Sequence, residues 1–100
     1  MKAKAVVLLF AFIFASNEAF AIQWCKLEIK NSDGSITTIV TADRNQKFFG
    51  KNVDKLDDCD TCWSEGKKNG PGSCTTGSKQ YIITCLKNDG KTKSESFPCP

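Results

Sequence analysis

The sequence contains no histidine, and this absence excludes several kinds of chemistry. Catalysis by Ser-His or Cys-His pairs, general acid–base catalysis by histidine and histidine metal ligation all need an imidazole. Long apolar runs are also lacking. The longest, from Ala5 to Ala15, has about 11 residues, whereas a helix that crosses a bilayer needs roughly 20. We therefore expect a soluble protein without a membrane-spanning segment.

A strong excess of one charge is lacking as well. The chain has 14 basic and 11 acidic residues, and without Lys2, Lys4 and Glu18 of the N-terminal segment 12 and 10 remain, a net charge of about +2. A nucleic-acid binder needs a dense basic stripe to neutralise phosphates. A protein that acts on membranes usually has a concentrated cationic and apolar face, but Lys67-Lys68 is the only adjacent basic pair. We therefore expect neither nucleic acid nor membrane as a partner.

Residues 1–21 have the pattern of a secretory signal peptide. Lys2 and Lys4 form a basic region, the apolar run follows, and Ala19-Phe20-Ala21 supplies a small-x-small cleavage site before Ile22. The alternative, a membrane anchor, would need a longer apolar run. We expect residues 1–21 to be removed and residues 22–100 to form a single secreted cysteine-rich β domain.

All six cysteines lie in the expected mature chain, which predicts three disulfides in an oxidising compartment. A domain this small buries little surface and gains stability from such bridges. Six cysteines allow many pairings, and the sequence alone does not choose among them. The cysteines are Cys25, Cys59, Cys62, Cys74, Cys85 and Cys99.

The cysteine spacing also fits two other kinds of site. Cys59-Asp60-Thr61-Cys62 has the spacing of a thioredoxin-like redox centre, but such a centre requires a βαβ context that the sequence lacks. Cys59, Cys62, Cys74 and Cys85 could together form a zinc site. Export and the lack of histidine favour disulfides over both, so we expect no metal and no cofactor.

Carboxylates cluster just past the middle of the chain, at Asp54, Asp57, Asp58 and Asp60. A calcium site needs regular ligand spacing and a glycine at a sharp turn. Neither is present, so we interpret the cluster as a solvated acidic loop. Paired carboxylates could also hydrolyse a glycoside, but so small a domain leaves little room for a substrate cleft. We therefore expect no catalytic residues and no enzymatic activity.

The segment 22–42 has the pattern of a β-hairpin that turns at Asn31-Ser32-Asp33-Gly34. Its first half alternates Cys25, Leu27 and Ile29 with charged residues, so these three share an inward face. Its second half is rich in isoleucine, valine and threonine.

The register of this hairpin depends on the turn. A two-residue turn sets Leu27 opposite Val40, whereas a three-residue bulged loop sets it opposite Ile39. Both registers keep Cys25 on the inward face, where it could form a bridge to a second sheet.

The segment 78–97 predicts a second hairpin, which turns at Asn88-Asp89-Gly90. Its returning half is mostly polar, as is typical of an edge strand. Pairing places Cys85 opposite Lys93 or the next residue, and this geometry disfavours a bridge from Cys85 to Cys99.

The segment between the hairpins is less regular. Phe49, Val53 and Leu56 have helical spacing, but Gly50 weakens a helix, and a strand over residues 46–49 is equally open.

We predict a loop over residues 64–77, because this segment holds four glycines and Pro71. Within it, Asn69-Gly70-Pro71-Gly72 is the one candidate for the exposed rigid loop of a protease inhibitor.

The two tryptophans stand next to cysteines, at Trp24 and Trp63. Packing in the core is the more common role for such residues, and binding through an aromatic anchor is the alternative. Strand alternation places Trp24 on the outward face, so it is the better anchor candidate.

One stretch resembles the MAX effectors of plant-pathogenic fungi, which comprise the Magnaporthe avirulence proteins and their ToxB-like relatives. It reads Asp33-Gly34-x4-Ile39-x-Thr41-Ala42-x-Arg44-Asn45 and follows Trp24-Cys25 and an aliphatic strand. The resemblance covers about residues 22–59. It implies an all-β fold, a small disulfide-stapled six-stranded β-sandwich of two antiparallel three-stranded sheets, with a bridge from Cys25 to Cys59 or Cys62. The number of cysteines and the long C-terminal half depart from the family pattern.

The resemblance also implies a function. Several MAX effectors enter plant cells and bind heavy-metal-associated (HMA) domains of host proteins or immune receptors, by pairing their second strand with an edge strand of that domain. Here that strand is residues 35–41, and the alternative is that its residues only build the sheet. The implied contact residues are Trp24, Thr37, Thr38, Ile39, Thr41 and Asp43.

Together these observations predict a secreted, monomeric fungal effector of virulence or avirulence type. It would bind a host plant protein without catalysis, either outside the plant cell or after entry into its cytoplasm. The alternative is a small secreted disulfide-rich toxin or antimicrobial protein.

Overall fold

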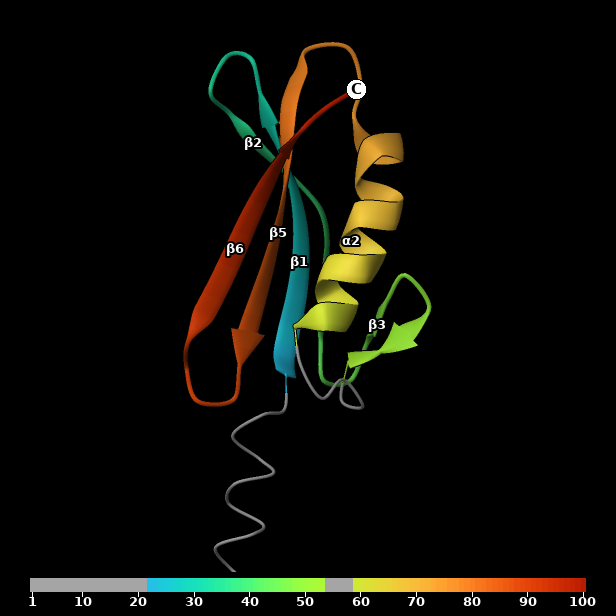
Figure 1. Ribbon diagram of the computed structural model, residues 1–100, viewed down its shortest axis with the longest axis vertical. Coiled ribbons are helices and arrows are strands. Elements are labelled where there is room, and N and C mark those ends of the chain that lie inside the picture. The colour runs from blue at the N-terminus through green and yellow to red at the C-terminus, as the bar shows by residue number, and fades with distance from the viewer. Residues whose placement is uncertain (1–21, 54–58) are drawn as a thin grey trace, which may run out of the picture.

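The computed structural model describes residues 22–53 and 59–100, which form two antiparallel sheets and one helix (Figure 1). Strands β2, β1, β5 and β6 form a four-stranded sheet in that order, and β3 pairs with β4 in a short second sheet. The elements are β1 (Ile22–Asn31), β2 (Ile36–Asp43), β3 (Lys47–Phe48), β4 (Lys51–Asn52), α2 (Asp60–Ser73), β5 (Ser78–Lys87) and β6 (Thr92–Pro98).

This architecture confirms a mostly β domain with two antiparallel sheets. The strands divide four and two, however, and not three and three, and the fold is not all-β because α2 lies against one face of the larger sheet (Figure 1). The predicted signal peptide and the acidic residues Asp54, Asp57 and Asp58 lie outside the described residues, as does Leu56.

The first hairpin contains both of the predicted registers. Near the turn Ile29 is opposite Thr37, as a three-residue loop requires, whereas Leu27 is opposite Val40, as a two-residue turn would require. The switch occurs because Ile39 is an extra residue in β2, which makes a β-bulge. The turn itself closes as expected, with Gly34 at a φ of 89° that glycine adopts without strain.

The second hairpin agrees with its prediction. It turns through Gly90, which has a φ of 84°, and it places Cys85 opposite Lys93. Strand β6 is an edge of the sheet, and Cys85 forms no bridge to Cys99. Between the hairpins, β3 confirms the strand alternative, and Phe49 takes a turn conformation with a φ of 49°.

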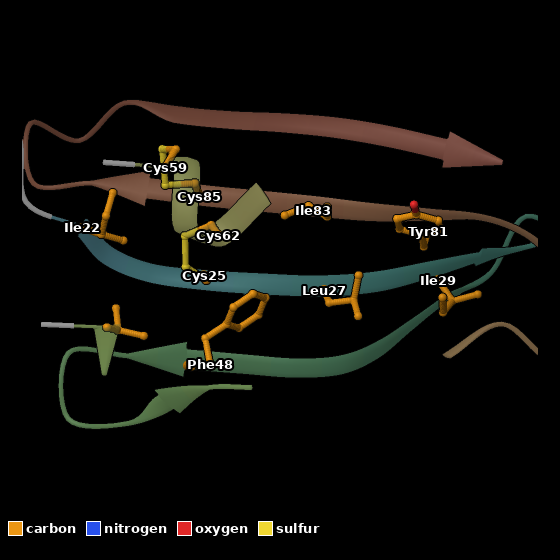
Figure 2. Packing of buried hydrophobic residues seen from close by; sticks show 12 residues of the cluster. Ile22, Cys25, Leu27, Ile29, Phe48, Cys59, Cys62, Tyr81, Ile83 and Cys85 are labelled. Atoms are coloured by element: carbon orange, nitrogen blue, oxygen red, sulfur yellow. A yellow bond between two sulfur atoms is a disulfide. The ribbon is translucent and has the colours of Figure 1, made fainter. Parts of the chain in front are cut away.

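The core lies between the four-stranded sheet and α2. Cys25, Leu27 and Ile29 of β1 are buried on one face, as their alternation predicted, and Ile83 of β5 lies beside them. The element that covers this face is α2, which was not predicted. Phe48 of β3 reaches into the same cluster (Figure 2). The helix and the β3–β4 hairpin thus together cover one face of the sheet.

The predicted loop over residues 64–77 is wrong, because residues 60–73 form helix α2. Gly66 and Gly70 lie one turn apart and are buried against β5. A Cβ atom on Gly66 would stand 2.5 Å from Cδ1 of Ile83, and one on Gly70 would overlap the ring of Tyr81. These glycines therefore permit close helix packing, although glycine alone disfavours a helix.

Three disulfides hold the helix to the sheet, as the cysteine count predicted. Two lie at the start of α2 and join it to the central strands β1 and β5 (Figure 2), and one joins its end to the chain after β6. The bridge from Cys25 to Cys62 also fits the span that the family resemblance implied. The pairs are Cys25–Cys62, Cys59–Cys85 and Cys74–Cys99.

Candidate binding surface along strand β2

Strand β2 stands at one edge of the four-stranded sheet (Figure 1), and no strand of the described residues pairs with its outer side. Its side chains are exposed except Val40 and Ala42. Ile36 is 49% exposed and Ile39 is 40% exposed, and they are the two exposed large apolar side chains in the described part of the chain. We call the strand's outer side, from Ile36 to Asp43, the β2 edge.

The residues predicted to bind all lie on β2 or beside it, but they do not share one face. Thr37 is opposite Ile29, so it lies on the side of the sheet that faces α2. Four of the predicted residues lie on the opposite, open side, which no other described helix or strand covers (Figure 1). They are Trp24, Thr38, Thr41 and Asp43.

Ile39 occupies the bulge and helps to line a groove between β2 and the end of α2. The groove has a volume of about 120 Å³. Besides Ile39, its lining includes Ile29 and Thr37 from the sheet and the hydroxyl-bearing residues Ser73 and Thr75 at and after the end of α2. The bulge divides the β2 edge into residues 36–38 and 40–43, and a bulge on an edge strand limits how far another strand can pair with it.

The start of β2 is held by side chains of the turn. The Nδ2 group of Asn31 donates hydrogen bonds to the hydroxyls of Ser35 and Thr37, both at 3.0 Å. Asp33 accepts from the hydroxyl of Ser35 at 2.6 Å and from its backbone N–H at 2.9 Å. These bonds lower the pKa of Asp33 because they favour the charged carboxylate.

The two tryptophans have different surroundings. Trp63 packs against the core cluster from α2, as expected for a tryptophan beside a disulfide. Trp24 is half-buried on the open side, opposite Asp43 and Leu86. The Lys26 Nζ atom lies 5.3 Å from the centre of the Trp24 ring and 3.6 Å from the carboxylate of Glu28.

The sequence did not identify Ile36 as a contact residue, although it stands in the predicted strand. Its exposure follows from two facts, that β2 is an edge and that Ile36 is opposite Lys30 on the open side. Alternation alone could have placed Ile36 on the open side, but the strand order could not be read from the sequence.

The described residues contain no helix long and apolar enough to cross a membrane. Within residues 22–53 and 59–100, no three histidine, cysteine, aspartate or glutamate side chains are grouped so that they could hold a metal ion. No family model, curated protein or solved structure matches the chain, so the β2 edge is interpreted from its own geometry.

Proposed function

We propose that this protein is a secreted fungal effector that binds a host plant protein without catalysis, through the β2 edge. The observation that carries the proposal is an unpaired edge strand with two exposed isoleucines. Unpaired backbone groups and exposed apolar side chains on one strand favour strand addition by a partner. Three disulfides in a small domain are compatible with an extracellular protein.

In this mechanism a strand of the partner pairs with one of the two parts of the β2 edge. Backbone hydrogen bonds supply the affinity, and side chains near the pairing supply the specificity. Ile39 stands between the two parts and provides the apolar contact. The resemblance to MAX effectors points to an HMA domain of a host protein or immune receptor as the partner, with the β3–β4 hairpin in the place of the second sheet of a sandwich.

The proposal predicts that the oxidised protein, expressed as the full chain in a secretory host, binds at least one plant HMA domain with a dissociation constant of about 1 μM or tighter. Replacing Ile39 with aspartate should weaken this binding by at least about tenfold, because a charge at the contact would lose its water. Isothermal titration calorimetry against a panel of such domains measures both.

Ser96→Asp is the matched control, because it adds the same charge to an exposed position on β6, the opposite edge of the sheet. This variant should bind as the parent does. No binding across the panel would reject the HMA domain as partner. Equal binding by the parent and Ile39→Asp would place the interface away from the β2 edge.

A further inference from the structure

The open side of the sheet carries a recess where β2 ends and β1 begins. It has a volume of about 340 Å³, and we call it the Trp24 recess. Each of its five lining side chains ends in a planar group, and four of these groups are polar. The lining residues are Gln23, Trp24, Asp43, Arg44 and Asn45.

Hydrogen bonds within the turn after β2 fix the polar side of this recess. The backbone N–H of Asn45 donates to Oδ1 of Asp43 at 2.9 Å, and the N–H of Gln46 donates to the Asp43 carbonyl at 3.0 Å. The N–H of Asp43 in turn donates to Oε1 of Gln46 at 3.0 Å. The turn therefore presents Arg44 and Asn45 from a backbone that is already ordered.

The polar side chains of the recess retain unused hydrogen-bonding capacity. In the described part of the chain, no hydrogen bond or ion pair engages the side chains of Gln23, Arg44 or Asn45. The two amides each offer a donor and an acceptor side by side, and the guanidinium offers paired donors. Arg44 and Asp43 balance each other's charge, so the recess favours a neutral ligand.

We propose that the Trp24 recess binds a neutral pyranose sugar. A pyranose ring has an apolar face of C–H groups that fits against the part of the Trp24 indole that Lys26 does not cover, and neighbouring hydroxyls around its rim that match amide, carboxylate and guanidinium groups. An aromatic surface with a few fixed polar groups is the usual composition of a small-ligand site. This site shares Trp24 and Asp43 with the implied contact residues but lies apart from Ile39, and it does not depend on a plant protein partner.

Tryptophan fluorescence of the secreted, oxidised protein tests the proposal, with N-acetylglucosamine trimer and β-1,4-glucose trimer as probes. In the Trp63→Phe variant, Trp24 is the only tryptophan, and its emission should change with a dissociation constant of about 1 mM or tighter for at least one probe. In Trp24→Phe, the emission of Trp63 should stay constant. A response to the first probe alone indicates a chitin-like ligand, and a response to the second alone indicates a glucan.

Asn45→Ala should weaken the response at least about fivefold, because the hydrogen bonds between the Asn45 side-chain amide and the sugar are lost. Lys47→Ala, on the neighbouring strand β3, should leave the response unchanged. Asn45 is exposed, so this variant keeps the fold even if a change at Trp24 does not. Constant Trp24 emission with both probes overturns the proposal. An equal response in the parent and Asn45→Ala also overturns it.

Discussion

Replacing Cys25 and Cys62 together with alanine is expected to lower the free energy of unfolding by about 4 kcal/mol. The bridge joins residues 37 apart in sequence, so without it the unfolded chain gains much freedom. Both sulfurs are also buried in the core, where they link β1 to the first turn of α2. Since small domains are stable by only about 5–15 kcal/mol, this loss would remove a large part of the total. Urea denaturation of the oxidised protein measures it.

The matched control is the double replacement of Cys74 and Cys99, which are only half-buried. This bridge joins residues 25 apart, and loop length alone separates the two pairs by less than about 0.5 kcal/mol. We expect the Cys25–Cys62 pair to be the costlier by more than this difference, because only its loss disturbs the core. An equal or greater cost for the Cys74–Cys99 pair would contradict the central role of the first bridge.

Gly70→Ala is expected to lower the free energy of unfolding by about 2 kcal/mol, although alanine is the better helix former. The added methyl group would overlap the ring of Tyr81, which is itself stacked on Phe97 with 5.2 Å between ring centres. The helix would have to move away from β5, and the contacts of Gly66 with Ile83 would loosen with it. Urea denaturation again provides the measurement.

Gly72→Ala separates this packing effect from helix propensity. Gly72 lies in the same helix, and a Cβ atom there would meet nothing within 4 Å. We expect this variant to be as stable as the parent, or more stable by up to about 1 kcal/mol. If Gly70→Ala were as stable as Gly72→Ala, α2 would not be packed tightly against β5.

The hairpins could be predicted because their signals are local. Alternation along β1 identified its buried face, and the glycines at positions 34 and 90 identified the turns. Helix α2 could not be predicted in this way. Gly66 and Gly70 disfavour an isolated helix. Their close packing against Ile83 and Tyr81 exists only once β5 lies beside the helix.

The candidate site was predictable to a similar extent. The strand that contains Thr37 and Ile39 was located, but the bulge was not, because each of the two registers satisfied the alternation of β1 equally well. The Trp24 recess could not be predicted either, since Gln23 and Asn45 line one recess only when β1 and β2 pair.

The unequal burial of the three bridges would have a consequence if the protein entered a host cytoplasm, as one form of the proposed function requires. Cys74 and Cys99 are partly exposed residues, whereas the two bridges at the start of α2 are buried in the core. In a reducing cytoplasm a small thiol such as glutathione would reach the outer bridge first. The covalent link between Cys99 and the end of α2 would then be lost, while two bridges still held the helix to the sheet and backbone hydrogen bonds still held Cys99 and β6 to β5. Reduction would thus begin at the bridge whose loss leaves the β2 edge and the core unchanged.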